Sequence, residues 1–185
     1  MITLDTHRKA AIITKMARLL RAAGSWCGET HLQKAIYVLQ TLTDVPLGYE
    51  FILYQYGPFS FDLRTEINAC EADGFLALEP QPIPYGPKLA ATARAEALHA
   101  RLPKTLGLYE PRMRFVAQSL GALGVTGLER LATALYVTEE LGPAARLDRR
   151  ARLLRQYKPH ISLASAFDAL REIDGLAKKC AAIGA

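Results

Sequence analysis

The sequence lacks the features of a membrane protein and of a disulfide-stabilised one. No apolar run approaches the roughly 18–20 residues that span a bilayer. The charged residues Arg8 and Lys9 are not followed by a hydrophobic signal region, so we expect no secretory leader. The three cysteines, Cys27, Cys70 and Cys180, form no CxxC pair, and their odd number leaves one unpaired in any disulfide scheme. These absences predict a cytoplasmic protein that does not enter membranes.

Signatures of catalysis and of metal binding are also missing. The four histidines are scattered without metal-ligand spacing: His7, His31, His99 and His160. No phosphate loop or dinucleotide fingerprint occurs. His31 or His160 could act as an acid or base, but neither has a Ser or Cys partner at a signature spacing. We therefore expect a protein that is not an enzyme and has no metal, cofactor or catalytic residues; a hydrolase of unknown substrate is the enzymatic alternative.

The composition is that of an ordinary globular protein. Internal repeats and long Ser/Gly/Pro tracts are absent, which excludes a solenoid or a mainly disordered chain. Hydrophobic residues make up 50% of the 185 positions, enough for a sizeable core. This length suits one domain, or one domain with a helical extension packed on it.

The basic excess of the chain is confined to residues 144–158. Against Asp148 alone, this segment carries Arg146, Arg149, Arg150, Arg152, Arg155 and Lys158. Removing these residues from the totals of 23 basic and 18 acidic side chains leaves 17 of each sign, so the whole net charge of +5 lies here. Arginine side chains suit phosphate or carboxylate groups, which favours nucleic acid or an acidic protein as partner.

A second interpretation of the Arg-rich segment makes it an ordinary solvated helix face. Its apolar residues are expected to face inward, with Arg146, Arg149 and Arg150 outward. Glu139 and Glu140, or acidic groups brought near by folding, could then neutralise these arginines. The sequence leaves both interpretations open.

Hydrophobic periodicity predicts a mostly α protein with a small β-sheet. Helices are expected over about 6–22, 29–42, 60–73, 92–102, 110–123 and 127–141, between 143 and 159, and from 162 onward. Strands are expected over 49–56, 75–78 and 88–91, the last two forming a β-hairpin wing. This order predicts a winged-helix-like module over 1–103, with 104–185 as a helical extension packed on it.

The helix over 29–42 is a candidate contact element. Its apolar residues follow a helical period, while Gln33, Lys34, Tyr37 and Gln40 point elsewhere. Gln can read adenine, and Lys can reach guanine or phosphate. The alternative is an ordinary polar face.

A motif of structural type follows the predicted strand over 49–56. Tyr56 ends the strand, and Gly57 with Pro58 is expected to break it and turn the chain sharply. Ser60 is placed to cap the next helix through its hydroxyl oxygen.

Four segments carry a resemblance to a known family. They are LQKAIYVLQ (32–40), LGYEFILYQYGPFSFDL (47–63), ADGFL (72–76) and YKPHIS (157–162). In these segments the chain resembles the YwgA-like proteins of bacteria and archaea, and more distantly the Panacea (SocA-type) antitoxin domain, which shares the helix, the strand and the YGP turn. The resemblance implies a mostly helical protein with a winged-helix-like part and without an established active site. Panacea domains act by binding partner proteins, notably toxins.

The sequence thus predicts a non-enzymatic, winged-helix-like binding protein. One hypothesis is a DNA-binding regulator or a defence-associated module, using the helix over 29–42 or the Arg-rich segment. The alternative is an antitoxin-like module that binds a partner protein. Homodimerisation through the apolar stripes of the C-terminal helices is compatible with either.

Overall fold

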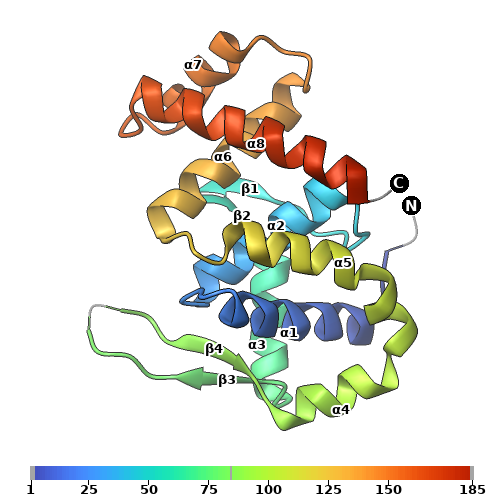
Figure 1. Ribbon diagram of the computed structural model, residues 1–185. Coiled ribbons are helices and arrows are strands. Elements are labelled where there is room, and N and C mark those ends of the chain that lie inside the picture. The colour runs from blue at the N-terminus through green and yellow to red at the C-terminus, as the bar shows by residue number, and fades with distance from the viewer. Residues whose placement is uncertain (1–2, 84, 184–185) are drawn as a thin grey trace.

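Helices dominate the computed structural model, which describes residues 3–83 and 85–183 (Figure 1). In chain order the elements are α1 (Thr6–Ala22), α2 (Glu29–Thr43), β1 (Ile52–Tyr54), β2 (Gly57–Phe59), α3 (Phe61–Ala72), β3 (Leu76–Glu79), β4 (Lys88–Ala91), α4 (Ala93–Arg101), α5 (Pro103–Leu120), α6 (Val125–Leu141), α7 (Leu147–Tyr157) and α8 (Leu163–Ile183). The predicted mostly helical class with little sheet is confirmed. Within the described ranges, every helix is too short or too polar to cross a membrane.

At the start of three helices, a capping side chain accepts a hydrogen bond from the main chain of the first turn. The Asp5 carboxylate accepts a hydrogen bond from Arg8 N at the start of α1. The Ser60 hydroxyl accepts one from Leu63 N at the start of α3, as predicted. Thr92 does the same for α4. Each cap provides an acceptor for a first-turn N–H group that has no partner inside its helix.

The predicted strand over 49–56 is wrong in length, and the predicted turn is misplaced. Only Ile52–Tyr54 is a strand, and it pairs antiparallel with Gly57–Phe59, with Tyr54 opposite Gly57. The chain therefore reverses at residues 55–56, and Gly57 and Pro58 belong to the returning strand. Gly57 has φ +85°, a conformation that suits glycine. Pro58 is tolerated because this strand has a free edge.

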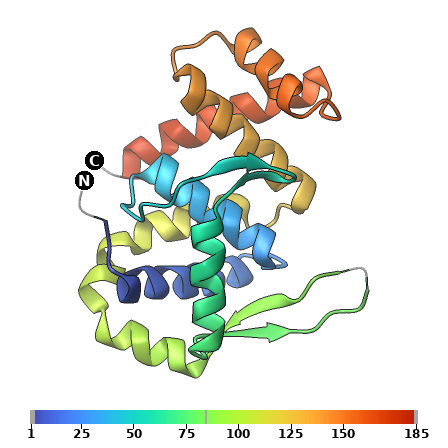
Figure 2. The same ribbon diagram turned by 180° about the vertical axis from the view of Figure 1, so that it is seen from behind.

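The second hairpin forms where the sequence predicts it. β3 pairs antiparallel with β4, from Leu76 opposite Ala91 to Glu79 opposite Lys88. This hairpin projects from the body of the molecule in both ribbon views (Figure 2). α3 crosses α1 and lies with the β1–β2 hairpin on the near side of Figure 2.

α5 begins earlier than predicted. The helix expected over 110–123 spans Pro103–Leu120. Proline suits a first helical position because the N–H group it lacks would have no partner there. Pro111 lies inside the same helix, so the sequence rule that a proline marks a helix end fails at this position.

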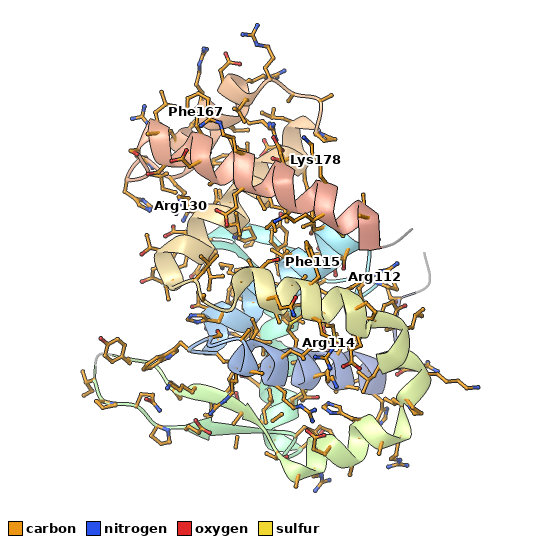
Figure 3. All side chains as sticks on the ribbon, viewed as in Figure 1. Arg112, Arg114, Phe115, Arg130, Phe167 and Lys178 are labelled. Carbon is orange, nitrogen blue, oxygen red and sulfur yellow. The ribbon has the colours of Figure 1, made fainter. Side chains whose placement is uncertain are left out.

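One buried core joins the N-terminal and C-terminal parts of the chain. It includes residues from Ala10 of α1 to Leu176 of α8, and every residue from His31 to Leu39 of α2 is buried. α2 contacts α1, α3, α5, α6 and α8, so it lies at the centre. Phe115 of α5 and Phe167 of α8 pack against this core from its edge (Figure 3). The apolar stripes of the C-terminal helices are largely buried within the chain, while Leu163 of α8 is exposed.

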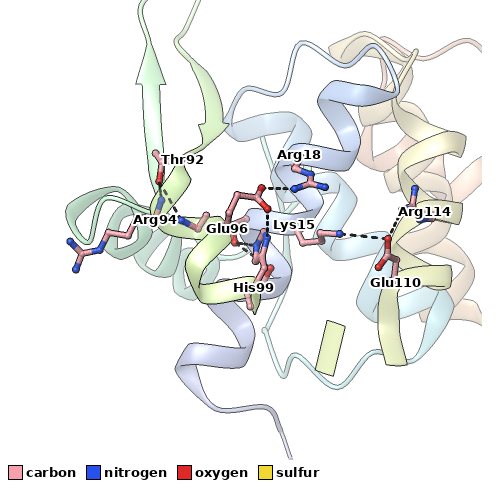
Figure 4. Close-up of polar contacts among 11 residues, drawn as sticks. Lys15, Arg18, Thr92, Arg94, Glu96, His99, Glu110 and Arg114 are labelled. Carbon is pink, nitrogen blue, oxygen red and sulfur yellow. Dashed lines mark hydrogen bonds and ion pairs between the residues drawn. The ribbon is translucent and has the colours of Figure 1, made fainter. Parts of the chain in front are cut away.

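Polar contacts fasten α4 and α5 to α1 (Figure 4). Thr14 Oγ1 lies 2.9 Å from His99 Nε2 in a buried contact. Arg18 pairs with Glu96 of α4. Lys15 Nζ lies 3.5 Å from Glu110 Oε1 of α5. Since α4 directly follows the β3–β4 hairpin, these contacts also fix the position of that hairpin's base.

Candidate binding site

Two glutamines of α2 hold the segment that contains the β1–β2 hairpin. Gln33 Nε2 donates to Ser60 O at 3.0 Å, and Gln33 Oε1 accepts from Ser60 N at 3.1 Å. Gln40 makes the same pair of bonds with the main chain of Tyr49, both at 2.8 Å. A separation of seven residues puts both glutamines on one side of the helix. They therefore hold the segment at both of its ends.

Lys34 and Tyr37 complete this face of α2. Lys34 is 1% exposed and donates from Nζ to Pro58 O at 2.7 Å. Burial, and next the nearby Lys158 charge, lower the Lys34 pKa to about 8. The Tyr37 hydroxyl donates to Glu139 Oε2 at 2.8 Å, and its ring packs against Phe51 with centroids 4.9 Å apart.

The expectation that Gln33, Lys34 and Tyr37 contact DNA or a partner is wrong. All three side chains are buried, and each has its polar atoms engaged within the chain. The polar residues of α2 face another segment of the protein instead of solvent. A helix period separates apolar from polar faces, but it does not reveal that the polar face will be covered.

A buried ion pair holds the turn of the same hairpin from the C-terminal side. Lys158 Nζ lies 2.9 Å from Glu129 Oε1 and donates to the carbonyl oxygens of Tyr54, at 3.0 Å, and Gln55. Both charged side chains are less than a tenth exposed. His160 Nε2 lies 3.6 Å from Glu129 Oε2. The LQK, YGP and YKPHIS segments therefore meet at one place.

The hairpin packs directly against α6. A Cβ atom on Gly57 would lie 3.1 Å from Thr133 Oγ1 and 3.4 Å from Glu129 O. The absence of a side chain at Gly57 thus lets β2 approach the helix closely. The contacts from α2, α6 and Lys158 make the hairpin a rigid support for the side chains it exposes.

Four side chains form an apolar surface, here called the aromatic patch: the exposed Ile52 and Tyr54 and the partly buried Phe59 of the hairpin, and the exposed Phe61 at the start of α3. Their neighbouring rings lie 5.1–5.9 Å apart, centroid to centroid. Ile52, Tyr54 and Phe61 are each about half exposed. Arg64 lies over the Phe59 ring at 5.1 Å. A contiguous exposed patch of this kind is typical of interaction sites.

A groove of about 760 Å³ lies beside the aromatic patch. It is bounded by the start of α2, by α3, by the β3–β4 hairpin and by the start of α6. Three aromatic side chains line it, Trp26, Tyr56 and Tyr85, together with the polar side chains of Glu29, His31 and Glu71. Tyr56 belongs to the turn of the β1–β2 hairpin, so the groove and the aromatic patch adjoin.

The groove carries two carboxylates in different environments. Glu29 pairs with Arg64, at 2.8 and 3.2 Å. Glu71 has no ion-pair partner in residues 3–83 and 85–183, and burial, followed by the charge of Glu29, raises its pKa. Burial alone lowers the pKa of His31, whose ring has no hydrogen-bond partner among the residues described.

The Arg-rich segment lies at the end of the molecule far from the β3–β4 hairpin in both ribbon views. Arg150 is buried and pairs through both guanidinium branches with Asp174, at 2.7 and 2.8 Å. The expectation that Arg150 points outward is therefore wrong. Position 150 falls three residues after Leu147 and four before Leu154, on the apolar stripe of the helix, so the sequence did contain the signal.

The other arginines of the segment are exposed. Arg146 and Arg152 each lie 3.1 Å from a carboxylate oxygen of Asp148. Arg149 and Arg155 have no ion-pair partner within the described part of the chain. Both interpretations of this face therefore stay open for the four exposed side chains.

Several residues of the site were missed in the sequence. Phe59, Tyr85 and Trp26 are single aromatics in segments without a period, so no pattern marks their place. Phe61 lies in the predicted helix over 60–73, off the buried stripe of Leu63 and Ile67, so the period contained a signal for its exposure. The pairing of Glu129 with Lys158 joins residues of two different helical segments, which sequence spacing does not reveal. Among the residues described, no His, Cys, Asp and Glu side chains gather to hold a metal ion. No family model matches the chain, and the search of curated proteins found no similar protein.

Proposed function

We propose that the protein acts as a non-enzymatic binding module for another protein, through the aromatic patch and the groove beside it. The observation that carries this proposal is the ring cluster of Tyr54, Phe59 and Phe61, in which Tyr54 and Phe61 are about half exposed, on the internally anchored hairpin and the start of α3. Interfaces between proteins are enriched in aromatic residues, and a rigid anchor loses little conformational entropy on binding.

The order of elements supports a winged-helix-like interpretation of residues 1–103. Three helices precede the β3–β4 hairpin, with α3 next to it in the chain, and the β1–β2 hairpin is inserted between α2 and α3. In such a module α3 would be the recognition helix. α3 carries Asp62, Glu66 and Glu71 against Arg64, a net charge of −2. A negative helix repels the phosphate backbone, so this face favours a protein partner over DNA.

Photocrosslinking in the native host tests the proposal. A benzophenone amino acid at position 54 or 61 is expected to give one and the same protein adduct. The matched control is position 108 on α5, where Leu108 is 65% exposed and apolar but distant from the hairpin in the chain. Adducts that are the same from all three positions, or that are absent from 54 and 61, contradict the proposal.

A second experiment separates binding from folding. Tyr54→Ser with Phe61→Ser is expected to abolish recovery of the crosslinked partner with the purified protein, because the exposed rings are removed. The thermal midpoint should stay within a few degrees, since both rings lie on the surface. Retention of the partner by this double variant excludes the aromatic patch as the contact surface.

Nucleic-acid binding through α7 is the second candidate. It is favoured by the exposure of Arg146, Arg149, Arg152 and Arg155 on one helix. Replacing these four with Ala is expected to abolish retardation of a DNA duplex at low salt, and added salt should weaken binding steeply. Absence of retardation by the unaltered protein at low salt rejects this candidate.

A further inference from the structure

The charged side chains that line the groove in residues 3–83 and 85–183 are acidic, and one basic side chain, Lys88, lies beside it on the Trp26 ring. Of the charged residues that line it in the described part of the chain, Glu29 and Glu71 are both carboxylates. Arg64 neutralises Glu29 from outside the groove. Glu71 therefore carries the unpaired charge. The neighbouring charge that raises the pKa of Glu71 is that of another carboxylate, Glu29. A cation in the groove would relieve this repulsion.

The groove also offers aromatic faces that suit a cation. Trp26 and Tyr85 lie together, with ring centroids 5.1 Å apart. Lys88 Nζ lies 4.2 Å from the centroid of the Trp26 ring, so an ammonium group of the chain itself occupies one face of this ring and shows that the ring suits a cation. Cation–π contacts of this type favour lysine, arginine or a methylated ammonium.

His31 supplies an independent indication that the groove takes a ligand. The ring lies in the first turn of α2, is 4% exposed and lines the groove. Its ring nitrogens have no hydrogen-bond partner among residues 3–83 and 85–183 and are not fully enclosed by protein, so a molecule in the groove can bond to them. A neutral imidazole has one acceptor nitrogen, which suits an N–H donor such as an ammonium or guanidinium group.

We propose that the groove binds a lysine or arginine side chain of the partner protein, with Glu71 as the ion-pair acceptor, Trp26 and Tyr85 as the aromatic wall and His31 as a hydrogen-bond acceptor. This inference rests on the proposed function and specifies the chemistry of its partner. The partner's basic side chain would enter the groove while its apolar residues cover the aromatic patch. Arg64, which contacts both Glu29 and Phe59, lies where the two surfaces meet.

The only tryptophan of the chain, Trp26, reports on the groove directly. The probe is the peptide acetyl-Ala-Leu-Arg-Leu-Ala-amide, and the control is the same peptide with citrulline, which keeps the shape of arginine without its charge. The arginine peptide is expected to change Trp26 fluorescence saturably. The citrulline peptide should bind about tenfold more weakly, the usual difference for one charge-assisted hydrogen-bonded contact.

Glu71→Gln identifies the acceptor. This substitution should weaken binding of the arginine peptide about tenfold and leave the citrulline peptide unchanged. Glu172→Gln, at an exposed position of α8, is the matched control and should change neither affinity. Circular dichroism of both variants establishes that they are folded.

Three results overturn the inference: equal affinity for the two peptides, an unchanged affinity in Glu71→Gln, or no saturable fluorescence change with the arginine peptide. Each is separable from failure of the proposed function. If positions 54 and 61 give crosslinks but the arginine peptide does not change Trp26 fluorescence, only the proposal that the groove binds a basic side chain is rejected. If the crosslinks are absent, the protein-binding role is rejected.

Discussion

At the scale of the residue, polar side chains of α2 act as partners for main-chain atoms. Gln33 and Gln40 each occupy both the N–H and the C=O group of one residue, as a neighbouring strand would. Lys34 and Lys158 bind three further carbonyl oxygens. The segment over 49–60 contains only three-residue strands, so these side chains supply much of its hydrogen bonding.

Loss of the two hydrogen bonds made by one of these glutamines should lower the free energy of unfolding. Gln33→Met leaves the buried N–H group of Ser60 without a partner, whereas Ser60 O keeps its bond from Arg64 N at 3.1 Å. We expect a loss of about 1–3 kcal/mol in the free energy of unfolding. Gln40→Met affects a less buried pair and should cost about 1 kcal/mol. Urea denaturation measures both, with the exposed Gln118→Met as control. A Gln33→Met protein as stable as Gln118→Met contradicts this role.

The lowered pKa of Lys34 predicts a pH dependence. The folded pKa is about 8 against an ordinary value of 10.5. Between these values the unfolded chain binds more protons, so this group makes stability rise with pH. From pH 7 to pH 9 the wild-type protein should gain about 1 kcal/mol relative to Lys34→Met.

Comparison with Lys34→Met isolates this lysine in urea titrations at several pH values. Burial raises the pKa of both Cys27 and Cys70 to about 12, which lowers stability as pH rises above 9, but these thiols are common to both proteins. Stability curves that run parallel from pH 7 to pH 9 would show that Lys34 keeps its ordinary pKa in the folded state.

At the scale of the element, caps and apolar periods predicted most helices and the β3–β4 hairpin, while the covered polar face of α2 and the three-residue strands β1 and β2 escaped prediction. Asp5, Ser60 and Thr92 give local signals, because a cap bonds to its own helix within three residues. The β1–β2 hairpin is different. Its three-residue strands are held by α2, α6 and Lys158, which lie far away in the sequence, so no local period reveals where it turns.

Close approach between helices makes Gly121 a sensitive position. A Cβ atom there would lie 2.5 Å from Ala23 Cβ and 2.7 Å from Ala23 O, at the junction of α1 and α5. Gly121→Ala should therefore force the two helices apart and cost about 1–3 kcal/mol. Gly107, in the same helix α5, has open space around it.

Gly107→Ala is the matched control, and its effect should have the opposite sign. It should stabilise the protein by about 0.5–1 kcal/mol, because alanine has the higher helix propensity. Thermal denaturation of both variants decides the matter. Equal shifts in the midpoint would mean that α1 and α5 do not meet as closely as the structure has them.

At the scale of the whole molecule, residues on both sides of position 103 share one core. Leu32 and Ile36 of α2 belong to the same buried cluster as Val116 of α5 and Leu131 of α6. The sequence predicted an N-terminal module with a helical extension packed on it. It could not reveal how far α2 is enclosed, because helix contacts between distant segments leave no local pattern.

A fragment of residues 1–103 is expected to lack a cooperative thermal transition, since α1 and α2 would expose their apolar contacts with α5 and α6. The full chain should unfold in one step, with Trp26 fluorescence and far-ultraviolet circular dichroism changing together. A fragment that melts cooperatively would show that the N-terminal module is autonomous.

The anchoring of residues 49–60 through peptide groups has an evolutionary consequence. Gln33, Gln40, Lys34 and Lys158 grip amide and carbonyl atoms that every amino acid possesses. Substitutions at Ile52, Tyr54 or Tyr56 would thus leave the attachment intact while altering what the outer surface recognises. A lineage carrying this frame could exchange one target for another by a few point changes, without rebuilding the scaffold beneath.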